Sequence, residues 1–176
     1  MTRRLLALVL LAACGAEPDP LDPGEIDDVA KGEGDADGDA RSGTYLIAAT
    51  STRACDCAEV QGIDLCDADL TQIGDGSLVT LMQTDGYLLL SPASAPGLLS
   101  LTGSLDADGS FDLGGLYDLS SVVGEGDLVT RLTGEFAGAD RFTALLRTRV
   151  SGTLDGEPVD CRTEVDVTGE RQTSPP

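Results

Sequence analysis

The sequence predicts an all-β domain in which about eight antiparallel strands form an up-and-down meander that closes into a small barrel. Apolar and polar residues alternate from residue 42 to residue 171, and no helical periodicity interrupts the alternation. Asp-Gly pairs supply the positive φ of two-residue hairpin turns. They recur at Asp75-Gly76, Asp85-Gly86, Asp108-Gly109 and Asp155-Gly156. Closure removes exposed strand edges, and a two-sheet β-sandwich is the alternative.

The turn spacing places strands at residues 43–54, 77–84, 86–91, 98–105, 110–119, 128–136, 141–154 and 158–169. The alternation is clearest in the last two of these strands. In the seventh strand one face carries Phe142, Ala144, Leu146, Thr148, Val150 and Leu154. In the eighth strand the inward face carries Val159, Cys161, Thr163, Val165 and Val167. A period of two with one polar face predicts a sheet that is packed on one side and solvated on the other.

The interior of this domain has few large side chains available. The chain contains three Phe, three Tyr and no Trp, so Leu, Val and Ala must fill most of the core. Small residues also fall at inward positions, namely Gly103, Ala144, Thr148 and Thr163. The interior is therefore either thin or incompletely filled, and the sequence leaves both alternatives open.

The first strand opens with Gly43-Thr44-Tyr45, and with the meander that follows it this opening resembles the lipocalin-like β-barrels. The tryptophan that usually follows the opening glycine in that family is absent here, and Tyr45 stands nearby. The resemblance implies a barrel, and no functional residue is transferred from it.

The chain begins with the features of a signal peptide over residues 1–13. Arg3 and Arg4 precede an apolar run over residues 5–13, which is shorter than the ~20 residues of a membrane-spanning helix. The ending Leu11-Ala12-Ala13-Cys14 resembles the lipobox of bacterial lipoproteins. In that family the cysteine becomes the first mature residue and carries the lipid, palmitate included. The resemblance implies attachment to a membrane through Cys14, and ordinary secretion is the alternative.

The residue after the cysteine gives an expectation about location. Gly15 follows Cys14, at the position where many lipoproteins that stay in the inner membrane have Asp. By this resemblance we expect a lipid-anchored protein of the cell envelope, placed in the outer membrane.

Residues 14–41 are rich in Pro, Gly, Asp and Glu and poor in apolar residues. Such a segment cannot bury enough apolar surface to offset its ordering entropy. We therefore predict a disordered acidic linker with a typical reach of about 30 Å. It precedes the β-domain of residues 42–171, and residues 172–176 are predicted to be a disordered tail.

The linker contains a weak calcium candidate. Asp35, Asp37 and Asp39 alternate like the first ligands of a calcium loop. Ala40 and Leu46 stand where the EF-hand pattern needs Gly and Glu. The later positions of the calcium-loop pattern are therefore not matched, and we prefer to interpret these acids as part of a solvated linker.

With Cys14 assigned to lipid, Cys55, Cys57, Cys66 and Cys161 remain. An even number of cysteines in an exported chain predicts two disulfides. The first and last strands of a closed meander are neighbours, so we expect Cys161 to pair with Cys55 or Cys57 and Cys66 to pair with the one left over. The alternative is a zinc site of four thiolates with Cys55 and Cys57 as a close pair, although structural zinc sites usually have wider spacing.

Composition excludes several classes of function. The net charge of −20 argues against nucleic acid as a partner, because binding phosphates requires clusters of Lys and Arg. The chain has no histidine, the usual general base and the commonest metal ligand. We therefore expect no enzymatic activity and no cofactor. The alternative, a hydrolase with paired carboxylates, finds its acids in predicted turns, at Asp106, Asp108, Asp155 and Glu157.

Five arginines lie on the last three predicted strands, and they suggest either an anion-binding patch or cross-strand ion pairs. They are Arg131, Arg141, Arg147, Arg149 and Arg162. We favour ion pairs on the solvated face. Their expected acidic partners are Glu135, Asp160, Glu164 and Asp166.

The sequence thus predicts a lipid-anchored extracytoplasmic β-domain with a non-catalytic role in binding or envelope structure. A carrier of a small apolar ligand inside the barrel is the first alternative. The sequence identifies neither a protein partner nor a ligand.

Overall fold

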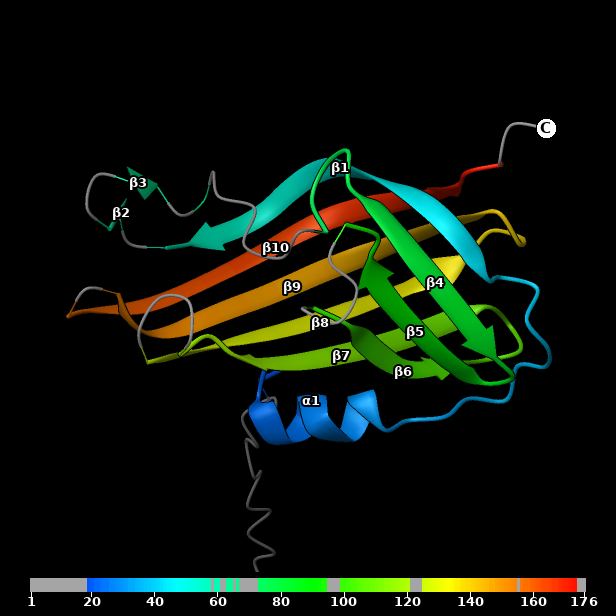
Figure 1. Ribbon diagram of the computed structural model, residues 1–176, viewed down its shortest axis with the longest axis horizontal. Helices are drawn as coiled ribbons and strands as arrows, with labels where there is room; N and C mark the ends of the chain where they lie inside the picture. Colours follow the sequence, from blue (N-terminus) through cyan, green and yellow to red (C-terminus); the bar gives the residue numbers. More distant parts are fainter. Residues whose placement is uncertain are drawn as a thin grey trace, which may run out of the picture.

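The computed structural model describes residues 19–57, 59–60, 63–64, 66, 73–94, 99–120, 125–154 and 156–173. Within these residues, eight antiparallel strands form a closed barrel in the order β1-β10-β9-β8-β7-β6-β5-β4 (Figure 1). The barrel strands are β1 (Gly43–Asp56), β4 (Leu78–Thr84), β5 (Tyr87–Pro92), β6 (Leu101–Leu105), β7 (Ser110–Asp118), β8 (Gly126–Phe136), β9 (Arg141–Leu154) and β10 (Glu157–Arg171). A small hairpin of β2 (Glu59–Val60) and β3 (Ile63–Asp64) follows β1. The predicted meander and its closure are confirmed.

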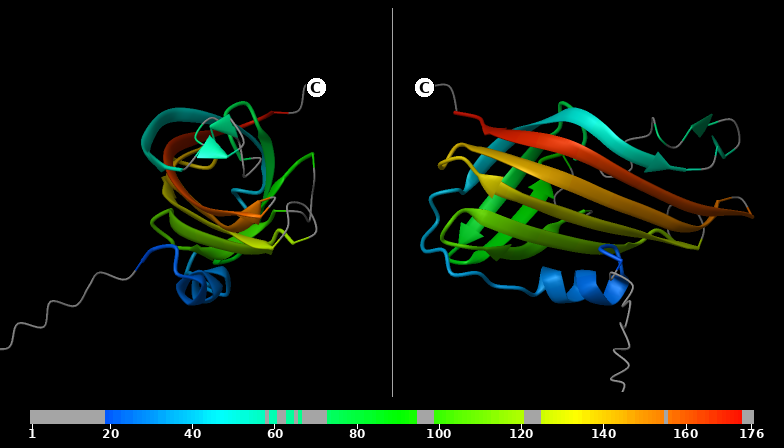
Figure 2. Two further views of the ribbon diagram at one scale, coloured as in Figure 1. Left: turned by 90° about the vertical axis from the view of Figure 1, so that its left-hand side faces the viewer. Right: turned by 180° about the vertical axis from the view of Figure 1, so that it is seen from behind.

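The strands of the barrel differ greatly in length. Strands β1, β9 and β10 have 14 or 15 residues, whereas β4, β5 and β6 have 5 to 7. β1 pairs with β4 only from Gly43 to Leu46 but continues along β10 as far as Asp56. The long strands therefore project beyond the short ones as a curved sheet (Figure 2). One end of the barrel is enclosed all round, and we call the other the open end.

The enclosed end is filled by aromatic side chains. All three phenylalanines, Phe111, Phe136 and Phe142, pack there with Tyr45, and neighbouring ring centroids lie 5.3 to 6.4 Å apart. Arg171 stacks on the Tyr45 ring at 5.6 Å. Tyr45 also donates its hydroxyl to carbonyl oxygens at this end. Of the two alternatives for the interior, this end is solidly packed despite the small supply of aromatic residues.

The prediction of a disordered linker over residues 14–41 is wrong from residue 19 onward, while residues 14–18 lie outside the described residues. Helix α1 (Pro23–Ala30) lies against β6, β7 and β8. The Asp22 side chain accepts hydrogen bonds from two N–H groups of its first turn. Ile26 is fully buried and packs with Leu21 and Val129. Three apolar residues of the segment, Leu21, Ile26 and Ala36, are buried in contact with the barrel, which overall composition could not reveal.

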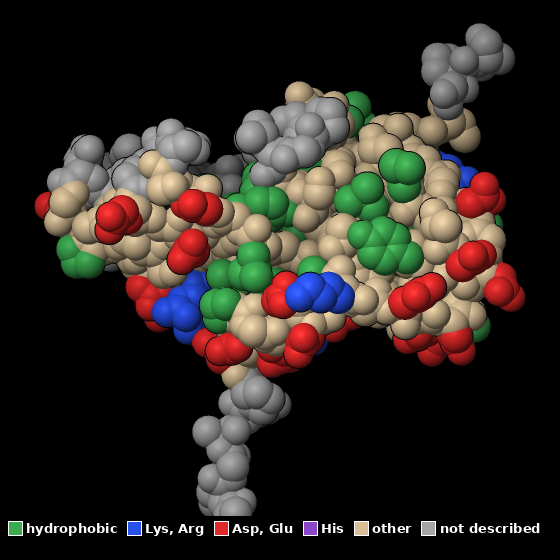
Figure 3. Space-filling view, turned by 60° about the horizontal axis from the view of Figure 1, so that its bottom comes forward, with side chains coloured by type: hydrophobic (Ala, Val, Ile, Leu, Met, Phe, Trp, Pro, Cys, Tyr) green, Lys and Arg blue, Asp and Glu red, His purple; other side chains and the backbone are tan. Residues whose placement is uncertain are grey.

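Arginines of the barrel neutralise the acids of this segment. Arg131 on β8 forms ion pairs with Glu25 at 2.8 Å and with Asp112 on β7 at 2.7 Å. The hydrogen bonds to Asp112 raise the pKa of the Arg131 guanidinium. Asp19 lies 2.8 Å from Arg162 on β10. Acidic side chains far outnumber basic ones on the face that carries α1 (Figure 3), so these few arginines balance the charge locally.

The chain then continues over the barrel wall toward β1. The Gly34 N–H donates to the Gly86 carbonyl and the Ala36 N–H donates to the Leu105 carbonyl. A Cβ on Gly86 would lie 2.0 Å from the Gly34 oxygen, so the close approach requires glycine there. We call residues 19–42, helix included, the strap. In the described residues no helix has the length and apolarity that a membrane crossing needs.

The predicted C-terminal tail is ordered at its start. The Gln172 N–H donates to the Thr44 carbonyl at 2.7 Å. Residues 174–176 lie outside the described residues.

We expect Ile26→Ala to lower the free energy of unfolding by about 2–4 kcal/mol, because it leaves a cavity between α1 and β8. Chemical denaturation of the purified domain measures this change. Asp28→Ala, at an exposed position of the same helix, should change the free energy by less than about 0.5 kcal/mol. Equal stability of the Ile26→Ala variant and the original protein would show that the strap does not belong to the fold.

Candidate functional site

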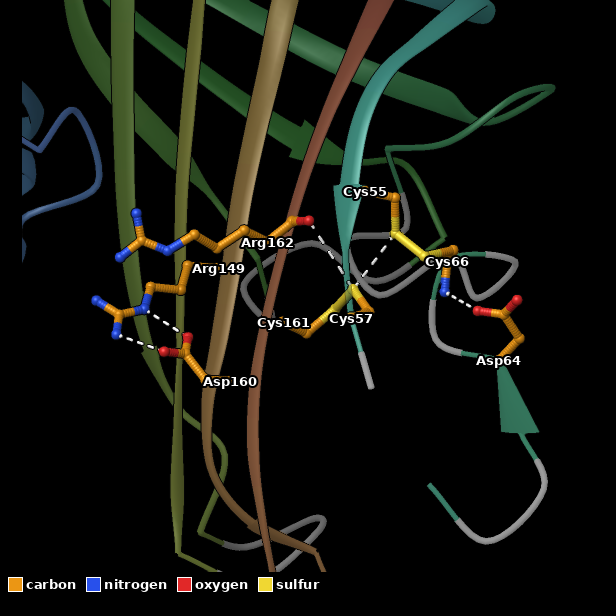
Figure 4. The surroundings of a disulfide bond; sticks show 8 residues. All are labelled: Cys55, Cys57, Asp64, Cys66, Arg149, Asp160, Cys161 and Arg162. Atoms are coloured by element: carbon orange, nitrogen blue, oxygen red, sulfur yellow. Dashed lines mark hydrogen bonds and ion pairs between the residues drawn. A yellow bond between two sulfur atoms is a disulfide. The ribbon is translucent and has the colours of Figure 1, made fainter. Parts of the chain in front are cut away.

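Two disulfides lie where β1 reaches the open end (Figure 4). Cys57 pairs with Cys161 of β10, with a Cα–Cα distance of 4.2 Å. Cys55 pairs with Cys66, with a Cα–Cα distance of 5.9 Å. The predicted bond across the seam is confirmed, and Cys57 rather than Cys55 is the partner of Cys161. Cys161 is buried and packs with Val159 and Val150.

The zinc alternative is wrong. The sulfur atoms of Cys55, Cys57 and Cys66 do lie within 4.8 Å of one another. Each of them is bonded to another sulfur, whereas zinc requires free thiolates. The disulfides account for this cluster.

The calcium candidates lie in the strap and do not converge. Asp35 accepts a hydrogen bond from the Ala107 N–H at 2.7 Å. Asp37 and Asp39 contribute backbone carbonyls, to Gln83 and Ser42 respectively. Among the described residues, the carboxylates of Asp35, Asp37 and Asp39 do not gather into a group of three metal ligands. Asp35 and Asp37 instead hold the strap to the barrel, and the Asp39 bond lies within the strap.

The turn acids of the hydrolase alternative also have local roles. Asp108 accepts hydrogen bonds from the hydroxyl and the N–H of Ser110, and these bonds lower the pKa of Asp108. Asp106 accepts from the same hydroxyl. A catalytic carboxylic acid needs a raised pKa, so the shift at Asp108 runs against that role. Glu157 is exposed, and Asp155 lies outside the described residues.

All five arginines form ion pairs, but only Arg147 and Arg149 pair with acids of the predicted set. Arg147 pairs with Glu164 at 3.0 Å and Arg149 with Asp160 at 2.8 Å. The hydrogen bonds from Arg149 lower the pKa of Asp160. The other pairs join Arg141 to Glu170 and Asp166 to Arg53, and Arg131 and Arg162 hold the strap. Glu135 forms no ion pair among the described residues. The arginines are therefore engaged by acids and do not form an open anion-binding patch.

The inward faces of β7 to β10 form rows across the barrel wall. In the register of the sheet, Leu132, Leu146 and Val165 form one row. The next row toward the open end consists of Gly115, Thr130, Thr148 and Thr163, and we call it the threonine row. The row after that consists of Tyr117, Leu128, Val150 and Cys161. A polar row thus lies between two mainly apolar ones.

Two hydroxyls of the threonine row are buried without a partner. The Thr130 and Thr148 side chains are 2% and 3% exposed. The Oγ1 atom of each has no hydrogen-bond partner among the described residues. A buried unsatisfied group costs about 1–3 kcal/mol. The inward direction of Thr148 and Thr163 is as predicted, whereas Thr130 escaped notice because its place depends on the register between β8 and β9.

The hydroxyl of Tyr117 lies near this row. A Cβ on Gly115 would lie 2.7 Å from the Tyr117 hydroxyl oxygen and 2.7 Å from Leu101 Cδ2. The absence of a side chain at Gly115 therefore lets the Tyr117 ring lie over the row. Tyr117 donates to the Ser100 carbonyl, and burial raises the pKa of its hydroxyl. The polar groups at this level of the barrel are thus neutral hydroxyls.

Comparison of the chain with protein-family models, with curated proteins and with solved structures finds no match. The function is therefore argued from the residues of this chain.

We expect loss of the Cys57–Cys161 bond to cost more stability than loss of the Cys55–Cys66 bond. The first bond spans 104 residues and the second 11, so the first restricts the unfolded chain more. Loop-closure entropy predicts losses of about 4–5 and about 3 kcal/mol for the respective double Cys→Ala variants. Denaturation under oxidising conditions compares the two, and a larger loss for the second pair would contradict the expectation.

Proposed function

We propose that the chain is a lipid-anchored protein of the bacterial cell envelope, placed in the outer membrane, whose β-barrel has a non-catalytic role in binding or envelope structure. The observation that carries the proposal is the pair of disulfides, one of which closes the barrel seam. Disulfides persist in oxidising compartments outside the cytoplasm. They agree with the signal-peptide and lipobox pattern of residues 1–14, which lie outside the described residues.

Several features favour binding over catalysis. The chain has no histidine, and its four domain cysteines form disulfides. The arginines of β8, β9 and β10 are engaged in ion pairs. Of the acids that sequence reasoning considered for a hydrolase, Asp106 and Asp108 are exposed before β7, and Glu157 is exposed at the start of β10.

Cys14→Ala should abolish membrane attachment. Expressed in a bacterium with an outer membrane, the original chain should partition into the detergent phase and incorporate labelled palmitate. The variant should be soluble and unlabelled because lipid cannot be added without the thiol. Gly15→Asp is the matched control for location, and it should keep the lipid but move the protein to the inner membrane. An unlabelled original chain would refute lipidation.

A second candidate function is that of a carrier for a small apolar ligand inside the barrel. It is favoured by the polar threonine row, which separates two apolar clusters of the core. On β8 and β9 the main core cluster extends as far as Leu132 and Leu146, and Tyr117 of β7 packs against it. A separate small cluster of Val159 and Cys161 lies beyond the threonine row. The threonine row, whose side chains are small, lies between the two clusters on β8 and β9.

The carrier function predicts that the protein binds an apolar dye and that native mass spectrometry detects a co-purifying ligand. Met82 and Leu78 lie on the outer wall and are 55% and 46% exposed, so the double variant Leu78→Gln, Met82→Gln controls for surface binding. Dye binding should survive in this control. Absence of both ligand and dye binding would refute the carrier function and leave a structural role.

A further inference from the structure

We propose that the threonine row is the recognition element of a site for an uncharged amphipathic ligand, which presents a hydroxyl or carbonyl oxygen to Thr130 and Thr148. The inference rests on the carrier function proposed above and specifies its ligand class. Fatty alcohols, esters and similar neutral lipids have this chemistry.

The two hydroxyls are placed to act together. Thr130 and Thr148 are direct register partners on adjacent strands, and both point inward between leucine-bearing rows. Side chains directly opposite on one face have Cβ atoms about 4.5–5.5 Å apart. Both hydroxyl oxygens are covered in the structure without ligand, so a ligand must displace neighbouring side chains to enter. Once there, one ligand oxygen can accept hydrogen bonds from both threonines.

Packing alone does not account for threonine at these positions. Valine has the same shape and would fill the same space without a buried hydroxyl. The neighbouring inward positions on the same strands are Leu128, Leu132, Leu146 and Val150. Threonine introduces two donors that no group in the described residues satisfies. A ligand oxygen would provide the missing partner.

The absence of charged side chains around the threonine row, among the described residues, favours a neutral ligand. No residue of the threonine row or of its two neighbouring rows is charged. The arginines of these strands, Arg131, Arg147 and Arg149, alternate with the inward residues and form ion pairs on the outside. A carboxylate inside the barrel would be a buried charge without a counter-ion, which is strongly unfavourable. The site should therefore reject a fatty acid in its ionised form.

The test compares decanol and decanoate binding to the full-length protein above neutral pH, by titration calorimetry. We expect decanol to bind roughly tenfold more tightly than decanoate. The double variant Thr130→Val, Thr148→Val should bind decanol roughly tenfold more weakly than the original protein. The same variant, free of ligand, should melt about 5 °C higher, because two unsatisfied hydroxyls are removed.

Thr133→Val is the matched control, since Thr133 lies on β8 but faces outward at the pocket formed by β8, β9 and β10. It should leave decanol affinity unchanged. A higher melting temperature of the double variant with unchanged decanol affinity would overturn the inference, because the row would then serve packing alone. Preference for decanoate would overturn the neutral class. If the protein binds the dye but the threonine substitutions do not change decanol affinity, the carrier function stands and only this inference is refuted. If the protein binds neither dye nor decanol, both the carrier function and this inference are refuted.

Discussion

The pairing of β1 with β10 is the constraint on which the rest of the structure depends. Every other junction of the barrel except β1 with β4 joins strands that follow one another through a short turn or loop. The β1–β10 seam joins the two ends of the domain, over ten register pairs, and must offset the loop-closure entropy of almost the whole domain. The Cys57–Cys161 bond fixes the seam at the open end, and the stacking of Arg171 on Tyr45 fixes it at the enclosed end.

The two ends of the barrel differ in the side chains that fill them. Tyr45 and the three phenylalanines gather at the enclosed end, where all eight strands surround them, and supply packing there. Toward the open end the wall consists of fewer strands, and its inward residues become smaller and partly polar. β1 has two register irregularities in this region. Such bulges bend a strand and discourage pairing with another chain along its free edge.

Features encoded by local pattern could be predicted from the sequence, and features that depend on distant partners could not. The Asp-Gly turns and the alternation in β9 and β10 sufficed for the strands, for their inward faces and for the seam disulfide. The strap was missed because its acids have partners on the barrel, such as Arg131 and Arg162. The pairing of Thr130 with Thr148 depends on register, and the choice between Cys55 and Cys57 depends on where β1 ends.

The strap also determines how far the barrel can stand from a lipid surface. With lipid on Cys14, as proposed, the chain between the lipid and Asp19 could span at most about 18 Å. A linker disordered as far as residue 41 would have let the barrel move much farther from the lipid surface. The strap joins the barrel on its side wall, beside β7 and β8. The point at which the strap begins would therefore stay within about 18 Å of the lipid surface.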